Sequence, residues 1–283
     1  MVRVALAQMR SGRTVMENVE AVERFAEEAA GAGAAYLQTP EMTTLLERSR
    51  TALIEKIAPE AEAEAIARLR DAARRNRLTL HVGSLPFALD AGKVANRAFV
   101  IGPDGAVLAT YDKIHLFDVD LDNGESWRES ATYQGGERAV MVETEAFSLG
   151  LSVCYDLRFA ALYRALAQGG AQVLAVPAAF TRQTGEAHWH VLLRARAIET
   201  GSFVLAAAQG GRHEDGRETY GHSLIVDPWG RVLAEKTDAE PGLLIADLEL
   251  SRVAEARQRI PALQHDRVFT LDRIARPARL DGA

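Results

Sequence analysis

Features of secreted, membrane-spanning and nucleic-acid-binding proteins are scarce in this sequence. Its 283 residues include one cysteine, so an internal disulfide is impossible and a reducing compartment is expected. No apolar run is long enough to cross a bilayer, and the N-terminus becomes polar too early for a signal peptide. The net charge of −6 disfavours a nucleic-acid-binding surface. We therefore expect a soluble, cytoplasmic protein that binds neither membranes nor nucleic acids.

Internal repeats, low-complexity linkers and shifts in composition are also absent from the sequence. Hydrophobic residues make up 48% of the chain and charged residues 25%, which is typical of a globular protein with a substantial core. One domain over residues 1–283 is therefore predicted, with an extended C-terminal tail at about 260–283.

Motifs for metal ions and dinucleotides are incomplete. The segment 213–216 begins with His-Glu but lacks the second histidine of a His-Glu-x-x-His zinc motif. His188 and His190 are two residues apart on an expected helix, so they do not share a face. The segment 209–211 lacks the Gly-x-Gly-x-x-Gly spacing of a dinucleotide-binding turn. Neither a metal nor a cofactor is expected.

Apolar segments with strand and helix periodicity alternate along the chain. We expect strands at 2–8, 35–39, 78–87, 96–101, 106–111, 171–177, 202–209 and 243–248, and hairpins at 140–153 and 223–236. Helices are expected at 18–29, 59–77, 157–167, 187–200 and 250–259, and loops at 121–136, 180–185 and 210–219. This order predicts an α/β protein with a mixed sheet, or with two stacked sheets and helices outside.

The single cysteine, Cys154, ends an apolar segment and precedes the helical pattern that begins at Leu157. A strand-to-helix turn can expose one side chain beside helix N–H groups, and these groups favour a thiolate over a thiol. A thiolate at this position would be a nucleophile. Alternatively, Cys154 is a small buried hydrophobic residue, which is the usual role of a free cysteine.

Glu41 and Lys113 each have two interpretations as well, and Glu129 is a further candidate. Glu41 follows a predicted strand that Pro40 breaks, where α/β proteins place their chemistry, or it is a solvated loop residue. Lys113 follows a predicted hairpin and either extends its charge into water or holds it in a pocket. Glu129 lies in the long polar loop 121–136, and long loops in compact domains are often functional.

Three separated segments, 40–42, 111–117 and 152–159, contain the glutamate, the lysine and the cysteine in that order. Together they resemble the Glu–Lys–Cys signature of the nitrilase superfamily of carbon–nitrogen hydrolases, and the similarity covers nearly the whole chain. Glu129, in an Arg-Glu-Ser sequence, matches the additional carboxylate of that family's site. Segments 187–200, 220–223 and 226–230 resemble the Nit amidase branch, with the deaminated glutathione amidases nearest. Proline and glutamate commonly stand in that branch where Glu186 and His190 stand here.

The resemblance implies an α-β-β-α sandwich that pairs into an α-β-β-α-α-β-β-α homodimer core. Amide hydrolysis needs a nucleophile, an oxyanion stabiliser and a proton carrier. The resemblance assigns the attack to Cys154, oxyanion stabilisation to Lys113 and the backbone N–H of Tyr155, and proton transfer to Glu41. Glu129 would orient Lys113 or position the substrate.

The implied reaction releases ammonia from a small carboxylate-bearing amide, with deaminated glutathione as the best candidate. Two anionic ends would suit arginines in the loops expected after residues 177 and 209. Candidate substrate-binding residues are Arg182, Phe180, His188 and Arg212, and Arg217 lies in the second loop. An ω-amidase substrate resembling 2-oxoglutaramate, a nitrile and a carbamoyl compound are alternatives. A non-catalytic scaffold dimer is an alternative of a different class.

Overall fold

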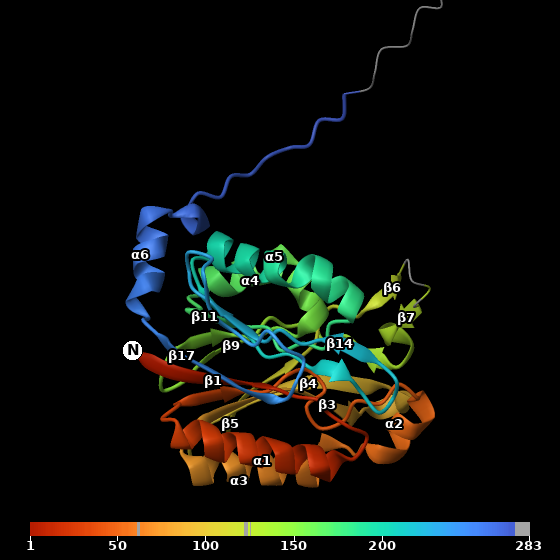
Figure 1. Cartoon of the computed structure of the whole chain (residues 1–283). Helices are drawn as coiled ribbons and strands as arrows, with labels where there is room; N and C mark the ends of the chain where they lie inside the picture. The colour runs from red at the N-terminus through yellow and green to blue at the C-terminus, as the bar shows by residue number, and fades with distance from the viewer. Residues whose placement is uncertain (61–62, 122–123, 125, 275–283) are drawn as a thin grey trace, which may run out of the picture.

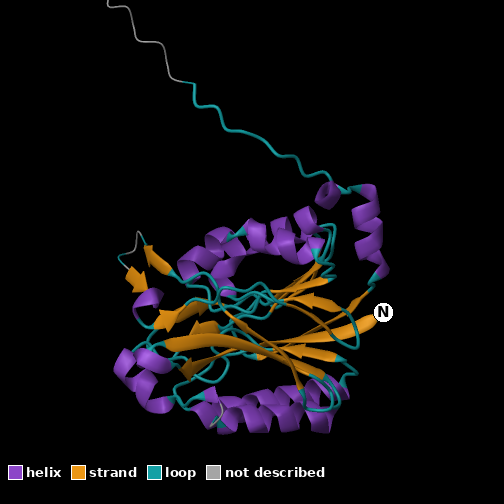
Figure 2. Cartoon of the chain, turned by 180° about the vertical axis from the view of Figure 1, so that it is seen from behind, coloured by secondary structure: helices purple, strands orange, loops and turns teal. Residues whose placement is uncertain are grey.

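Two β-sheets stacked face to face lie at the centre of the computed structural model, which describes residues 1–60, 63–121, 124 and 126–274. Helices cover the outer face of each sheet, so the layers run helix, sheet, sheet, helix (Figure 1). Figure 2 shows the same layers from behind, with the strands in the middle. The predicted α-β-β-α sandwich is therefore confirmed.

The first sheet is mixed, with parallel strands at its centre and antiparallel strands at both edges. Its strand order is β17-β1-β2-β3-β4-β5, and β8 pairs with β4. β1 to β3 run parallel, β17 is antiparallel to β1, β4 is antiparallel to β3 and β5, and β8 is parallel to β4. The bounds are β1 Val2–Gln8, β2 Tyr36–Gln38, β3 Thr79–Ala88, β4 Val94–Ile101, β5 Val107–Asp112, β8 Tyr133–Gln134 and β17 Gly242–Leu248.

The second sheet follows the same plan, with three parallel strands inside antiparallel edges. Its order is β16-β15-β12-β11-β10-β9, and β10 to β12 run parallel. The bounds are β9 Met141–Glu143, β10 Ser148–Gly150, β11 Val173–Ala175, β12 Phe203–Ala206, β15 Leu224–Val226 and β16 Val232–Glu235. Two separate hairpins pair β6 Asp118–Asp120 with β7 Ser126–Arg128, and β13 Gly210–Arg212 with β14 Glu218–Tyr220.

Alanine-rich helices cover the two sheets. α1 (Val15–Gly31) and α3 (Glu64–Asn76) lie side by side on the first sheet, and α4 (Ala160–Gln168) and α5 (Arg182–Thr200) lie on the second (Figure 1). The remaining helices are α2 Arg50–Lys56 and α6 Ser251–Arg259, with 3₁₀ turns at Asp90–Gly92, Glu129–Ala131, Cys154–Arg158 and Ala262–Gln264.

The core has two layers, and β1 contributes to both. Val4 and Leu6 belong to the cluster between the sheets, whereas Ala5 and Ala7 belong to the cluster beneath α1 and α3. All four side chains are fully buried. A strand buried on both faces carries apolar residues at successive positions instead of alternating with polar ones, which explains its continuous apolar sequence.

Three local predictions differ from the structure. The expected loop at 180–185 is wrong, because α5 begins at Arg182, where the hydroxyl of Thr181 accepts a hydrogen bond from the N–H of Thr184. The expected loop at 210–219 contains the β13–β14 hairpin, and the expected loop at 121–136 contains β7 and β8. Short paired segments of this kind lack the alternating apolar pattern on which strand prediction depends.

The C-terminal segment leaves the sandwich after α6 (Figure 1). The predicted tail at about 260–283 begins with the 3₁₀ turn Ala262–Gln264; residues 265–274 are exposed and contain no helix or strand, and residues 275–283 lie outside the described residues. Within the part of the chain that the structure describes, no helix combines the length and the apolar character needed to span a membrane.

Candidate active site

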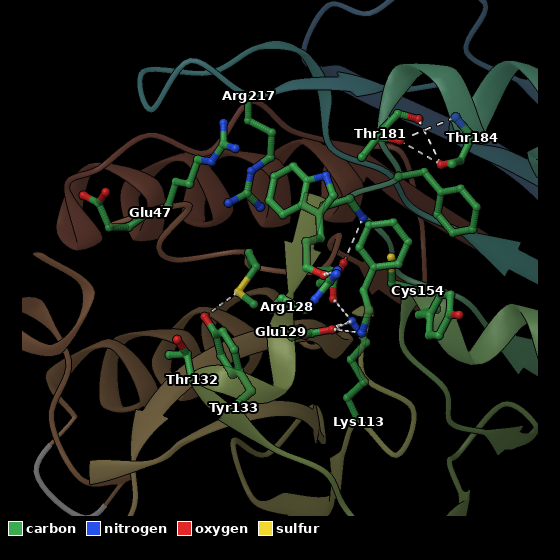
Figure 3. Close-up of a pocket in the computed structure, with 18 of the residues that line it drawn as sticks. Glu47, Lys113, Arg128, Glu129, Thr132, Tyr133, Cys154, Thr181, Thr184 and Arg217 are labelled. Atoms are coloured by element: carbon green, nitrogen blue, oxygen red, sulfur yellow. Dashed lines mark hydrogen bonds and ion pairs between the residues drawn. The ribbon is translucent and has the colours of Figure 1, made fainter. Parts of the chain in front are cut away.

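A pocket of ≈ 270 Å³ lies among the loops that follow β2, β5, β10 and β11. Glu41, Lys113, Glu129 and Cys154 all line it, although more than a hundred residues separate the first from the last. Figure 3 shows Lys113 and Glu129 joined by hydrogen bonds, with Cys154 in the same cavity. The structure therefore brings together the four side chains that the sequence analysis singled out.

The turn that contains Cys154 is strained. Cys154 has a φ of 51°, in the left-handed region that residues other than glycine rarely adopt. Its N–H donates a hydrogen bond to the carbonyl of Pro177 at 2.9 Å, which ties the turn to the end of the neighbouring strand β11. Strained backbone of this kind persists where the surroundings fix it, and it is common at functional sites.

Asp156, two residues later, connects the cysteine turn to the lysine segment. Its Oδ2 accepts hydrogen bonds from the Tyr111 hydroxyl at 2.7 Å and the Val153 N–H at 2.8 Å. Its Oδ1 accepts the His115 N–H at 3.0 Å and contacts His115 Nδ1 at 2.6 Å. Because Tyr111 and His115 flank Lys113, one fully buried carboxylate positions the ammonium relative to the thiol. Sequence reasoning missed this residue, because its partners are distant in the chain.

The loop that carries Glu41 lies close to the backbone of β3. A Cβ at Gly83 would lie 2.3 Å from the carbonyl oxygen of Thr39 and 2.5 Å from that of Pro40, so only glycine fits there. Met42, the next residue after Glu41, has a φ of 55°, and its N–H donates to the Ser84 hydroxyl. The backbone on both sides of Glu41 is thus held in place, and its carboxylate accepts the N–H of Ala179 at 3.1 Å.

Lys113 joins the two carboxylates. Its Nζ donates to Glu41 Oε1 at 2.8 Å and to the two oxygens of Glu129 at 3.0 and 2.9 Å. Asn96 Nδ2 donates to Glu41 at 3.0 Å, and the Phe117 N–H donates to Glu129 at 2.6 Å. Only 2% of the Lys113 side chain is exposed, so water screens this charge cluster poorly. Asn96 is a second site residue that no local sequence pattern indicated.

The charges in this cluster set three pKa values. Burial alone would raise the pKa of Glu41, but the ammonium of Lys113 and several hydrogen bonds outweigh it and lower that pKa. Burial alone would lower the pKa of Lys113, but the carboxylates of Glu129 and Glu41 raise it well above its ordinary value. Both groups are therefore charged at neutral pH.

Cys154 behaves in the opposite way to the prediction. Burial, followed by the carboxylate of Glu41, raises the pKa of the Cys154 thiol well above its ordinary value, and the ammonium of Lys113 offsets only part of this rise. The prediction that helix N–H groups at this turn would make the resting group a thiolate is therefore wrong, although the ammonium of Lys113 does lower the pKa of the thiol. The resting group is a neutral thiol, which donates a hydrogen bond to the carboxylate of Glu41.

The predicted substrate-binding residues divide into two groups. Phe180 lines the pocket, and its ring packs against Trp189 with the ring centroids 4.9 Å apart. Arg182 does not line the pocket, because it lies on the surface, where it pairs with Glu186 and Glu218. The expectation that Arg182 borders the pocket is therefore wrong.

The other two candidates are also outside the pocket. Arg212 is exposed at the end of β13 and is not among the residues that line the cavity, so the expectation that it borders the pocket is wrong. His188 is exposed on α5 and does not line the cavity. Its Nδ1 lies 3.3 Å from the guanidinium of Arg158, which does line the cavity.

Different arginines line the cavity. The guanidinium carbons of Arg48 and Arg217 lie 4.9 and 5.0 Å from the ring centre of Trp127, so two cations contact one indole. Arg128 and Arg158 also line the pocket, and Figure 3 places Arg128 and Arg217 around it. Arg217 belongs to the segment 210–219 that the sequence analysis expected near the site. Planar guanidinium groups suit the carboxylates of a small anionic ligand.

Comparisons with known proteins agree with this geometry. The profile of the family described as carbon-nitrogen hydrolase matches residues 3–258. A deaminated glutathione amidase of Synechocystis is 43% identical over 269 residues, which are 94% of this chain and 97% of that protein. The human omega-amidase NIT2 is 36% identical over 265 residues, which are 94% of this chain and 95% of that protein.

Solved structures of two proteins are also similar to this chain. The NitFhit protein of C. elegans superimposes with a TM-score of 0.85 and 35% identity; the match covers 94% of this chain but only 65% of that longer one. An amidase from Nesterenkonia sp. AN1 superimposes with a TM-score of 0.77 and 30% identity over 92% of this chain and 98% of that one. A mutant of the Nesterenkonia amidase carries acrylamide added to its active-site cysteine.

Proposed function

Because this chain belongs to the carbon–nitrogen hydrolase family, we propose that its pocket hydrolyses a small carboxylate-bearing amide to the acid and ammonia, with Cys154 as the nucleophile. The observation that carries the proposal is the contact of one buried ammonium, Lys113, with the carboxylates of Glu41 and Glu129 beside the only thiol of the chain. A scaffold protein has no need of a buried charge cluster that is costly to desolvate.

In the first half-reaction, the sulfur of Cys154 attacks the amide carbonyl carbon while Glu41 takes the thiol proton. The raised pKa of Cys154 and the lowered pKa of Glu41 place the proton on sulfur at rest, so it moves only as the new bond forms. The resulting oxyanion faces the ammonium of Lys113 and the N–H of Tyr155. Glu41 then gives its proton to the amide nitrogen, and ammonia leaves.

In the second half-reaction, a thioester is hydrolysed by water. Glu41 accepts a proton from the water as its oxygen attacks the thioester carbonyl, and the proton then returns to the Cys154 sulfur as the acid is released. Glu129 accepts two hydrogen bonds from Lys113 and one from the backbone of Phe117, so it orients the ammonium through both stages.

Deaminated glutathione is the substrate we propose, because it carries a carboxylate at each end of the molecule. Arg48 and Arg217, which both contact Trp127, supply two cations at the pocket wall. Relatives named for this activity are 39 and 43% identical to the chain. A shorter ω-amide resembling 2-oxoglutaramate is the second candidate, supported by the similarity to omega-amidase NIT2.

The proposal extends to organisation. We place residues 1–283 in one cytoplasmic domain that forms a homodimer through the outer face of α5. Val191 and Ile198 on this helix, and the nearby Trp229, are 68%, 55% and 48% exposed. Apolar side chains gathered on one face in this way suit burial against a second copy. Sedimentation of the wild-type protein and of Val191→Glu would test the dimer.

The decisive experiment measures ammonia release from a panel of amides. The panel contains deaminated glutathione, a 2-oxoglutaramate-like amide, and a neutral amide of similar length. We expect release with the wild-type protein and an acyl-enzyme adduct by mass spectrometry, with both abolished in Cys154→Ala. Because alanine fits a site where the cysteine is 8% exposed, circular dichroism should be unchanged. Ammonia release retained in folded Cys154→Ala would reject the mechanism.

A further inference from the structure

A second cluster of ionisable side chains lies outside the pocket, between α5 and the second sheet. It consists of His190 on α5, His222 between β14 and β15, and Glu235 at the end of β16. Nε2 of His190 and Nδ1 of His222 each lie 2.8 Å from the same oxygen, Glu235 Oε1. None of the three lines the pocket, and the amide chemistry leaves them without a role.

The surrounding structure fixes the direction of both imidazoles. His222 has a φ of 54°, in the left-handed region, and its carbonyl accepts the indole N–H of the buried Trp189 at 2.8 Å. Its ring stacks on Tyr220, with ring centres 4.2 Å apart and planes 20° apart. Trp189 immediately precedes His190, so one buried side chain anchors both histidines. Backbone strain with this degree of support is typical of a binding position.

The three side chains are also accessible and offer the types of donor atom that zinc binds. Their side chains are 32%, 25% and 23% exposed for His190, His222 and Glu235, so an ion can reach them from water. Glu235 contacts both imidazoles through one carboxylate oxygen. Two imidazoles and one carboxylate form a recognised ligand set for zinc.

We propose that His190, His222 and Glu235 form a binding site for a Zn²⁺ ion. Their three ligand atoms all lie within 4.8 Å of one another. Bonds of about 2.0–2.2 Å in a tetrahedral arrangement bring ligand atoms about 3.3 Å apart, so the atoms that are now farthest apart need to approach by at most about 1.5 Å. The ion replaces the protons that the imidazoles now share with Glu235, and a water completes the fourth position.

His188 and His190 do not share a face of α5, as their spacing predicted, so they do not bind one ion together. His188 faces Arg158, away from the cluster. The missing partner for His190 comes instead from His222, which is 32 residues later in the chain. A bound ion would join α5 to β16 and to the β14–β15 connection. The first turn of the same helix contributes Thr184 to the lining of the pocket.

The test is a zinc titration of the full-length protein by calorimetry, with Cys154→Ala as the background so that the thiol cannot bind metal. We expect one Zn²⁺ per chain, and a rise in Tm of about 5 °C at a hundredfold excess of zinc over its Kd. Bound Co²⁺ should give the visible absorption of a tetrahedral site. These readouts do not depend on amidase activity.

The variants His190→Ala and Glu235→Gln should each weaken zinc binding by at least about 10–100-fold, which is the loss seen even for outer partners of metal ligands. His265→Ala is the matched control, because His265 is exposed near the C-terminus and should leave the affinity unchanged. The site is refuted if the wild-type protein binds no zinc at micromolar concentration. It is equally refuted if His190→Ala retains the full affinity, because the ion is then held elsewhere.

Discussion

Replacing Asp156 with asparagine tests whether one buried carboxylate aligns the thiol and the ammonium. The wild-type carboxylate has contacts at 2.6–3.0 Å with the side chains of Tyr111 and His115 and with the backbone N–H groups of Val153 and His115. In either orientation the asparagine amide places its NH₂ against one backbone N–H, while the hydroxyl or imidazole on that side can reverse its role. One buried donor therefore loses its acceptor.

The expected loss of stability follows from that count. A buried donor without an acceptor costs about 1–3 kcal/mol, and exchanging a charged acceptor for a neutral one weakens the remaining bonds, so we expect about 3 kcal/mol. Tyr111→Phe is the matched control, because it removes a single hydrogen bond to the same carboxylate and should cost about 1 kcal/mol. Urea denaturation followed by circular dichroism measures both values.

The kcat/KM of Asp156→Asn should fall by more than its loss of stability would cause. Tyr111 and His115 flank Lys113, so a shift of Asp156 moves the ammonium relative to Cys154, and a 1 Å displacement can cost about 10²-fold in rate. We expect kcat/KM for ammonia release to drop about 10²-fold in Asp156→Asn at temperatures where the variant is fully folded. The reasoning fails if Asp156→Asn is no less stable than Tyr111→Phe, or if its kcat/KM equals that of the wild type.

Three further variants test the site. Lys113→Met should lower kcat about 10²–10³-fold, because it removes an oxyanion stabiliser; an unchanged kcat would contradict that role. Glu41→Gln should lower the pKa of Cys154, since the carboxylate raises it, so alkylation by iodoacetamide should begin at lower pH than in the wild type; an unshifted or higher profile would contradict this. Arg217→Ala should raise KM for dicarboxylate amides more than for a neutral amide and leave kcat unchanged; equal effects on both would exclude carboxylate recognition.

Sequence patterns predicted the residues that share a local context. Glu41, Lys113 and Cys154 each follow a strand, but β2 and β5 belong to the first sheet and β10 to the second. Their common pocket was therefore predicted from the resemblance of their three segments to the family signature, and not from the strand order. The catalytic roles of these residues remain predictions. The periodicities of the chain predicted an α/β protein with one mixed sheet or two stacked sheets, and the resemblance to the family implied the α-β-β-α sandwich that the structure has.

Contacts between distant segments could not be predicted. Asp156 and Asn96 have partners far away in the chain, and no spacing rule identifies them. The position of Arg182 depends on the cap at Thr181, which extends α5 and turns the arginine to the surface. The pKa of Cys154 depends on burial and on the carboxylate of Glu41, which only the folded chain brings near it. A local sequence pattern shows which reactive groups are present, but the charges around those groups depend on the tertiary fold.

The neutral thiol beside Glu41 has a consequence for the lifetime of the protein in an oxidising cell. Peroxides attack thiolates, so the first oxidation, to the sulfenic acid, requires loss of the thiol proton. Because burial and the adjacent carboxylate keep that proton on Cys154, the resting protein exposes little of the form that oxidants consume. Cys154 is thus poorly reactive toward oxidants until a substrate binds and its carbonyl carbon accepts electrons from the sulfur.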